Sequence, residues 1–404
     1  MARLRVLITN MTLASRSGTE LYVRDLALGL LKRGHLPIVY SPHLGTIAEE
    51  LRTATIPVVD DMDRLEAQPD VIHGHHHLTT MTALMRFAPV PAVYVFHGAL
   101  SWHDVPPRFP RILRYVAVDE TCRDLLAFEH GIPEDRLRVM LNWVDLARFV
   151  PRGPLPARPR RALIFSNEAH ERTHLPAVRE ACGRAGLPLD VLGAGAGNVA
   201  DRPEDLLGRY DLVFAKAKCA LEALAVGAAV VLCDYRGAGP MVTVENLSAL
   251  RKFNFGIRTL GGPLCADALG REIRRYDAAE AAEVSRRIRA TAGLEESLDA
   301  LITLYREVID EHAALAGPPD LAAEERAAAT YFRRVAPHFA ELDQHRGEAA
   351  RLRAALEALG DAPAELENIK RTATWRLRDR LRGIPVAGPL LGALARLAAR
   401  RPPS

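Results

Sequence analysis

The fold of this chain is decided by the stretch Cys219-Ala-Leu-Glu222-Ala-Leu-Ala-Val-Gly227-Ala-Ala-Val-Val-Leu-Cys-Asp234-Tyr235. It predicts a short helix with one acidic residue, a glycine stop and then a buried strand. A further apolar strand at residues 211–214 completes a strand, loop, helix, strand unit. A carboxylate near the start of a helix, beside the carboxyl end of a parallel strand, is well placed to bind ribose hydroxyls, and the helix N-terminus supplies amides for phosphate. The stretch therefore suggests a nucleoside diphosphate ligand.

The same alternation of strands and helices extends in both directions from this stretch. In the second half we expect strands at 162–165, 189–192, 211–214 and 230–233, closed by a helix at 294–312. In the first half we expect strands at 5–9, 36–40, 58–59, 71–72, 93–96 and 114–118, with a helix from 20 to 32. Strands that alternate with helices predict parallel sheets covered on both faces.

Composition shifts divide the chain into three parts. A segment rich in Pro, Arg and Gly from 151 to 161 is typical of a linker, and the character changes again after Gly317-Pro-Pro319. We therefore predict an α/β protein with a Rossmann-like domain at 1–150, a second Rossmann-like domain at 151–316 and a helical, basic C-terminal extension at 317–404.

Bulk properties exclude several classes of protein. The net charge of +3 argues against a dedicated nucleic-acid binder. The five cysteines are dispersed, which fits reduced thiols in a cytoplasm better than disulfides or a zinc site. The apolar run at the N-terminus is too short for a signal peptide or a membrane span.

Glu222 is the first candidate binding residue. Its neighbours in the predicted helix are apolar, so a carboxylate among them needs a partner, and two ribose hydroxyls would serve. Lys216 and Lys218 lie just before this helix and could neutralise a diphosphate together with the helix N-terminus. The alternative for Glu222 is an exposed helix residue without a ligand. The alternative for Lys216 and Lys218 is that both are solvated surface lysines.

Two further candidates lie at predicted strand ends in the first half. Ser17-Gly18 precedes a helix and could let a phosphate or sugar approach the backbone, although a plain helix start is an equal alternative. The close glycine pattern of a dinucleotide site is missing there, which disfavours a dehydrogenase. His97 follows the strand at 93–96, at the edge where open α/β sheets bind ligands, although a lone histidine of this kind is more often structural.

A run of histidines, His73, His75, His76 and His77, follows the predicted strand at 71–72. A metal site would normally add a carboxylate or cysteine at suitable spacing. We therefore interpret the run as a crowded loop with polar edge histidines, and we expect no metal.

The chain over roughly residues 4–312 resembles the GT-B glycosyltransferases, specifically family 4-like enzymes of bacteria. Ser17-Gly18 with the helix after it, Lys32-Arg33-Gly34-His35 and Phe96-His97-Gly98 are similar to family motifs. The most specific run is Gly131-Ile-Pro-Glu-Asp-Arg136 followed by Asn142-Trp143-Val144-Asp145-Leu-Ala-Arg148-Phe149. Residues 222–231 resemble the family's second glutamate helix.

The resemblance implies roles for individual residues. Glu222 would hold the donor ribose, and His97 would line the cleft near the transferred sugar. The family's first glutamate is replaced by Phe214, and its basic pair for the diphosphate is absent from the stretch that contains Asn167 and Arg172. Lys218, Lys216 or Arg172 are the candidate substitutes. Trp143 stands where glycine is commoner in the family.

The C-terminal tail at 371–401 combines arginines, Trp375 and an apolar leucine stripe, and is similar to tails of bacterial surface-polysaccharide enzymes. Such a segment could bind an anionic membrane surface. The alternatives are a disordered basic tail and a partner-binding helix.

The sequence thus predicts a retaining glycosyltransferase that moves a sugar from a nucleotide sugar to a glycan or lipid-linked acceptor, in the cytoplasm at the inner face of the plasma membrane. The C-terminal domain would bind the nucleotide sugar, and the first domain would face the acceptor. We expect no cofactor, since the donor is a substrate. Two alternatives remain: a GT-B nucleotide-sugar epimerase, and a degenerate GT-B module that binds but transfers nothing.

Overall fold

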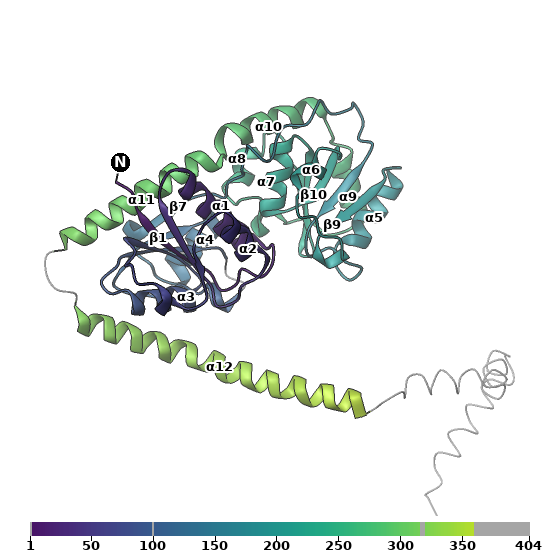
Figure 1. Cartoon of the computed structure of the whole chain (residues 1–404). Coiled ribbons are helices and arrows are strands. Elements are labelled where there is room, and N and C mark those ends of the chain that lie inside the picture. The colour runs from purple at the N-terminus through teal and green to yellow at the C-terminus, as the bar shows by residue number, and fades with distance from the viewer. Residues whose placement is uncertain (1, 99–100, 316–319, 359–404) are drawn as a thin grey trace, which may run out of the picture. The chain divides into compact units, whose positions relative to one another are not determined.

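The computed structural model of the chain describes residues 2–98, 101–315 and 320–358. Two α/β domains, each built around its own sheet, lie within one compact unit, Met1–Ala328 (Figure 1). The predicted class, two Rossmann-like domains followed by C-terminal helix, is confirmed.

The first sheet is parallel throughout and has the strand order β3-β2-β1-β4-β5-β6-β7. Its central strands are buried on both faces because helices cover both sides, as is usual for parallel sheets. The predicted strands are all present, whereas β7 is short and was not predicted. The strands are β1 (Arg5–Thr9), β2 (Leu36–Tyr40), β3 (Val58–Val59), β4 (Val71–His75), β5 (Ala92–Phe96), β6 (Ile112–Ala117) and β7 (Leu137–Val139).

Helices alternate with these strands. The first, α1, begins directly after Ser17 and packs against α2 and β2. A short α-helix, α4, continues into a single π-helical turn, η3. The helical segments of this domain are α1 (Gly18–Lys32), α2 (Thr46–Thr53), η1 (Met62–Arg64), α3 (His77–Arg86), η2 (Trp102–Asp104), α4 (Glu120–Asp124), η3 (Leu125–Glu129) and η4 (Glu134–Arg136).

The second sheet has the order β12-β11-β10-β8-β9, and only β12 at its edge is antiparallel. The sequence did not predict β12, because its Gly-Ala-Gly-Pro-Met composition has neither alternation nor branched residues. Two apolar clusters fill the two faces of this sheet. The strands are β8 (Ala162–Phe165), β9 (Leu189–Leu192), β10 (Leu212–Ala215), β11 (Ala229–Asp234) and β12 (Gly237–Met241).

The helix predicted from the deciding stretch is α7. Gly227 ends it with φ of +99°, a conformation that glycine adopts without strain. Its apolar residues pack on β10, β11 and α10. The helical segments of this domain are α5 (Leu175–Arg184), η5 (Ala194–Ala196), α6 (Glu204–Leu207), α7 (Ala217–Val226), α8 (Leu247–Arg251), η6 (Ile257–Thr259), α9 (Ala266–Ile273) and α10 (Ala278–Thr291).

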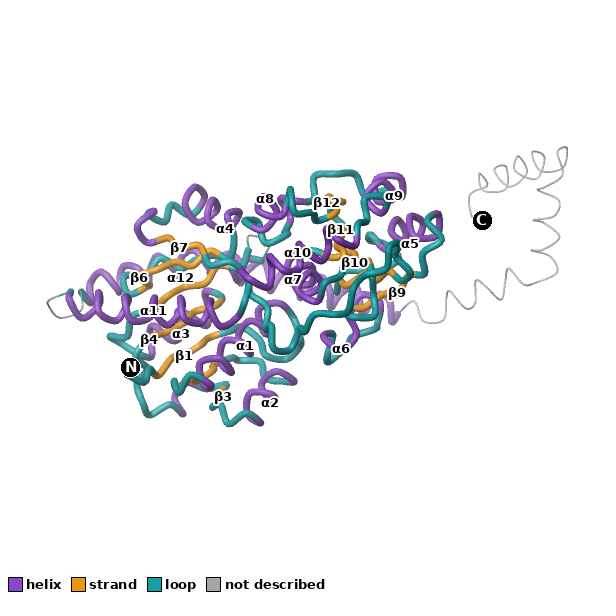
Figure 2. Tube along the Cα trace, turned by 90° about the horizontal axis from the view of Figure 1, so that it is seen from above, coloured by secondary structure: helices purple, strands orange, loops and turns teal. Residues whose placement is uncertain are grey.

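The helix α11 (Leu294–Ala314) follows the second domain in sequence but packs on the first. It contacts α1, β4, β5 and β6 (Figure 2). Leu298 fills the space left by Gly29 of α1, and the Tyr305 hydroxyl is 2.6 Å from His73 Nδ1. We expected this helix to close the second domain. Its apolar stripe instead completes the core of the first.

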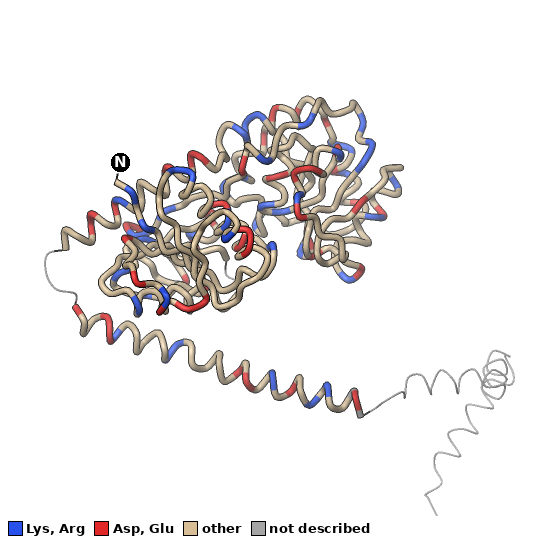
Figure 3. The backbone as a smooth tube through the Cα atoms, in the orientation of Figure 1, with Lys and Arg blue, Asp and Glu red and all other residues tan. Residues whose placement is uncertain are grey.

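The last described element is α12 (Leu321–Ala358), a long helix on which acidic and basic residues alternate (Figure 3). In the part of the chain that the structure describes, no helix has the length and apolarity needed to cross a bilayer. The tail at 371–401, for which we predict membrane contact, lies outside the described residues.

Candidate functional site

The carboxylate of Glu222 lies in α7 as predicted and is only 5% exposed. Its Oε1 is 3.5 Å from Lys218 Nζ, one turn earlier in the helix. Burial raises the pKa of Glu222, and the nearby Lys218 ammonium opposes this shift. The carboxyl group thus lies inside an apolar helix with one charged neighbour, where a ligand hydroxyl could form a further hydrogen bond to it.

The start of α7 is distorted. Ala217 has φ of +49°, which is unusual for a residue with a Cβ atom, and its N–H donates to the Phe255 carbonyl at 2.9 Å. This first amide is therefore occupied, whereas Lys218 and Cys219 in the same turn face a cavity.

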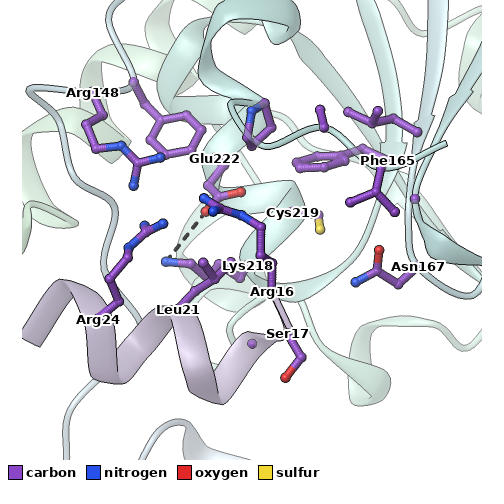
Figure 4. A pocket seen from close by; sticks show the side chains of 17 residues that line it. Arg16, Ser17, Leu21, Arg24, Arg148, Phe165, Asn167, Lys218, Cys219 and Glu222 are labelled. Atoms are coloured by element: carbon purple, nitrogen blue, oxygen red, sulfur yellow. Dashed lines mark ion pairs between the residues drawn. The ribbon is translucent and has the colours of Figure 1, made fainter. Parts of the chain in front are cut away.

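A cavity, here called the Glu222 cavity, opens between the two domains, and its empty space, including the part open to solvent, is about 710 Å³ (Figure 4). Its second-domain wall carries Phe165, Leu192 and Val199 together with Glu222. The first domain contributes the loop before α1 and the first turns of α1. The residues lining it are Arg16, Ser17, Gly18, Leu21, Arg24, Arg148, Phe149, Phe165, Asn167, Leu192, Gly193, Val199, Ala200, Pro203, Lys218, Cys219 and Glu222.

A second cavity, of about 580 Å³ and here called the His97 cavity, shares Gly18 and Lys218 with the first. A Cβ atom added to Gly18 would meet no other atom within 4 Å, so the space beside this backbone is open. The two cavities are therefore adjacent at Gly18 and at the Lys218 ammonium. The residues lining the second are Gly18, Thr19, Tyr22, His97, Val118, Asn142, Trp143, Ala217 and Lys218.

His97 is held by a buried network of rings. Its Nε2 is 2.7 Å from His75 Nδ1, and its ring packs edge-on against Tyr22, which also contacts Trp143 at a centroid distance of 4.0 Å. His73 extends the same cluster to Tyr305. These contacts fix the orientation of the His97 ring at the cavity wall.

Desolvation keeps the histidines of this network neutral. It lowers the pKa of His97 to about 4 and that of His73 to about 3, and it lowers the pKa of His75 well below the usual value. The interpretation of the histidine run as a loop with edge side chains was wrong. His73 and His75 lie within β4, and His76 and His77 are equally buried where α3 begins.

A further group, His76, His103 and Asp104, brings one ligand atom from each residue to within 4.8 Å of the others. The Met11 N–H donates to His76 Nδ1 at 3.1 Å, which places the ring proton on Nε2, the atom that faces Asp104 at 3.5 Å. A metal ion would need the lone pair of that nitrogen. The geometry therefore turns this N–H toward the Asp104 carboxylate and offers a metal ion no lone pair there.

Most of the predicted site residues converge on the two cavities. Ser17, Asn167 and Glu222 line the first, His97 lines the second, and Gly18 and Lys218 line both.

Lys216 and Arg172 line neither of these cavities. The Lys216 ammonium pairs with Glu168 at 2.8 Å and with the fully buried Asp234 at 2.5 Å, and Arg172 is exposed.

Three arginines of the Glu222 cavity were not predicted. Arg16 precedes α1, Arg24 lies in its second turn and Arg148 lies in the segment between the domains. Arg16 adjoins the predicted Ser17-Gly18 pair, and Arg148 belongs to the most specific family-like run, so both positions carried a signal. In the sequence, Arg24 looks like an ordinary residue of the predicted helix, so nothing there indicated its position in the cavity.

The comparisons with known proteins agree with this architecture. Residues 16–148, within the first domain, match the family model described as Glycosyltransferase Family 4. A search of curated proteins gave no significant match. The resemblance to family 4-like GT-B glycosyltransferases is thereby confirmed.

Two solved structures share the fold over about three quarters of the chain. A glycosyltransferase from Rickettsia africae is 15% identical with a TM-score of 0.58, and covers 76% of this chain and 99% of its own. Anabaena HepE in complex with UDP and glucose is 14% identical with a TM-score of 0.54, and covers 76% and 100%. These similarities show a GT-B fold, and the family-model match over residues 16–148 supports a glycosyltransferase function.

Proposed function

We propose that this protein transfers a sugar from a nucleoside diphosphate sugar to a glycan or lipid-linked acceptor in the synthesis of bacterial surface polysaccharide. The observation that carries the proposal is the pair of adjacent cavities. One contains the buried Glu222 carboxylate, the other the half-buried His97 ring, and Gly18 and Lys218 line both.

The nucleoside would occupy the Glu222 cavity. Glu222 is placed to accept hydrogen bonds from ribose hydroxyls, which are worth about 1.5–3 kcal/mol each when one partner is charged. Phe165 and Leu192 offer an apolar wall for the base. A related fold, Anabaena HepE, is described in complex with UDP-glucose, which makes uridine the first base to test.

The diphosphate would lie against Gly18 and Lys218, and the sugar in the His97 cavity. His97 Nε2 is engaged by His75, so contacts to a bound sugar would come from Nδ1 of the neutral ring. The site would act by aligning the sugar with the acceptor and by stabilising the charge that develops on the leaving diphosphate. We further propose retention of anomeric configuration, an acceptor bound by the first domain, and action at the inner face of the plasma membrane through residues 371–401.

The proposal is tested first by thermal shift with UDP, GDP, ADP, CMP and TDP, on the wild type and on Glu222→Gln, which keeps the size of the side chain. A ligand at a hundred times its Kd stabilises by about 2.7 kcal/mol. We expect one nucleotide to stabilise the wild type strongly and the variant weakly. If none binds at millimolar concentration, the transferase proposal fails.

Turnover then separates the transferase from its alternatives. A transferase releases nucleoside diphosphate and forms a glycoside, whose anomeric configuration NMR determines. An epimerase instead converts the nucleotide sugar without releasing nucleotide. Nucleotide binding without either product, across a panel of acceptors, would favour the degenerate module, to which the missing basic pair also points.

A further inference from the structure

The second domain contributes few cations to the cavity that its own Glu222 defines. In the stretch after β8, Glu168 pairs with Lys216, Arg172 is exposed, and the Asn167 carboxamide accepts a hydrogen bond from Ala194 N–H at 3.1 Å. Of the residues that the structure describes around the Glu222 cavity, Lys218 is the one cation that the second domain supplies.

The remaining cations come from elsewhere. Arg16 and Arg24 belong to the first domain, and Arg148 to the segment that leads into the second. Figure 4 shows the Arg24 and Arg148 guanidinium groups beside Lys218 and the Arg16 side chain extending toward Glu222. Among the described residues that line the cavity, Glu222 is the only acidic one.

Carboxylates behind the cavity wall hold these cations in place. Arg24 is paired with Asp25 at 2.6 Å and Arg148 with Glu204 at 2.9 Å, while Glu50 pairs with Arg16. None of the three carboxylates is among the lining residues. The side chain of Arg24 is only 6% exposed. Guanidinium groups fixed in advance and partly desolvated bind phosphate oxygens strongly, because little side-chain freedom remains to be lost.

We infer that Arg16, Arg24 and Arg148 bind the donor diphosphate, so that the first domain and the interdomain segment supply the charge that the second domain lacks. This inference rests on the proposed function. A diphosphate at this position contacts both domains, whereas the nucleoside contacts Glu222 and the apolar wall of the second. The phosphates, and not the base or ribose, therefore join the two halves of the site.

Isothermal titration calorimetry tests this with UDP and uridine, or with the matching diphosphate and nucleoside if the thermal scan selects another base. The variants are Arg24→Gln and Arg16→Gln, and Arg64→Gln is the matched control because that arginine is exposed and lines neither cavity. We expect each of the first two changes to weaken diphosphate binding at least tenfold and nucleoside binding less than twofold. Arg64→Gln should leave both unchanged.

The outcomes are distinguishable. If Arg16→Gln and Arg24→Gln bind diphosphate as the wild type does, or lose nucleoside affinity equally, the inference is overturned while the proposed function stands. If the wild type binds no nucleoside diphosphate, both fail. Because Arg24 is buried against Asp25, its variant could unfold, and circular dichroism checks this. Arg16, which is 15% exposed, provides the independent test in that case.

Discussion

Mild acid should destabilise the first domain, because His73 and His75 are buried and His97 is half-buried, all three in the neutral form. Desolvation lowers the pKa of His73 to about 3 and that of His97 to about 4, and it lowers the pKa of His75 well below its usual value. The unfolded chain binds protons at these residues near pH 6.5, whereas the folded chain does not. The free energy of unfolding therefore falls as the pH falls from about 6.5 towards the folded pKa values.

The magnitude follows from the same values. Between pH 7.5 and 5.5 each such histidine lowers the free energy of unfolding by about 1.4 kcal/mol, so the three together lower it by about 4 kcal/mol. His76 and Asp104 also titrate abnormally, since burial lowers the pKa of His76 to about 3 and raises that of Asp104 to about 7. Their effects on stability have opposite signs and largely offset each other.

Urea denaturation followed by tryptophan fluorescence measures this effect, since Trp143 is buried against Tyr22 beside the network. In His73→Asn the fall between pH 7.5 and 5.5 should shrink by about 1.4 kcal/mol. In the control variant His43→Asn, which changes an exposed histidine, the fall in the free energy of unfolding should be the same as in the wild type. The reasoning would be refuted if the free energy of unfolding of the wild type did not change between pH 7.5 and 5.5. It would also be refuted if the free energy of unfolding of His73→Asn fell as steeply as that of the wild type.

Three further predictions concern individual contacts. Tyr305→Phe removes the hydroxyl that is 2.6 Å from His73, and should cost about 1–3 kcal/mol in urea denaturation, because a buried nitrogen loses its partner. Gly193→Ala should lower the melting temperature and weaken nucleotide binding, because φ is +150° there and a Cβ atom would lie 2.0 Å from the Ser166 carbonyl oxygen. Lys216→Met should cost about 3–5 kcal/mol by leaving Asp234 buried and unpaired. Adding Asp234→Asn should restore part of that stability; if the double variant is no more stable than the single one, the ion pair is not the cause.

The local elements were predictable because their signals are local. Strands such as Arg5–Thr9 and Ala162–Phe165 lie at the predicted residues, since apolar runs between turn residues leave few alternatives. Glu222 could be selected for a similar reason: a lone carboxylate among apolar helix residues must find a partner. The edge strand β12 gave no such signal.

The choice of partner for each charge was not predictable. Lys216 and Lys218 are two residues apart and looked equivalent in the sequence, yet one neutralises Asp234 and the other faces the cavity. The strained backbone at Ala217, which lies between them, turns the two side chains in different directions. A hydrogen bond from the Ala217 N–H to the carbonyl of Phe255, in a distant segment, holds this backbone.

The sequence by itself therefore determined the two α/β domains, the helix that carries Glu222 and the family resemblance, because periodicity and composition act over a few neighbouring residues. Only the tertiary structure decided that α11 packs on the first domain, that the histidines of β4 are buried, and that Arg16 and Arg24 face Glu222 across a cavity. Those facts depend on which surfaces meet when distant segments pack, and long-range contacts leave no periodic trace in one sequence.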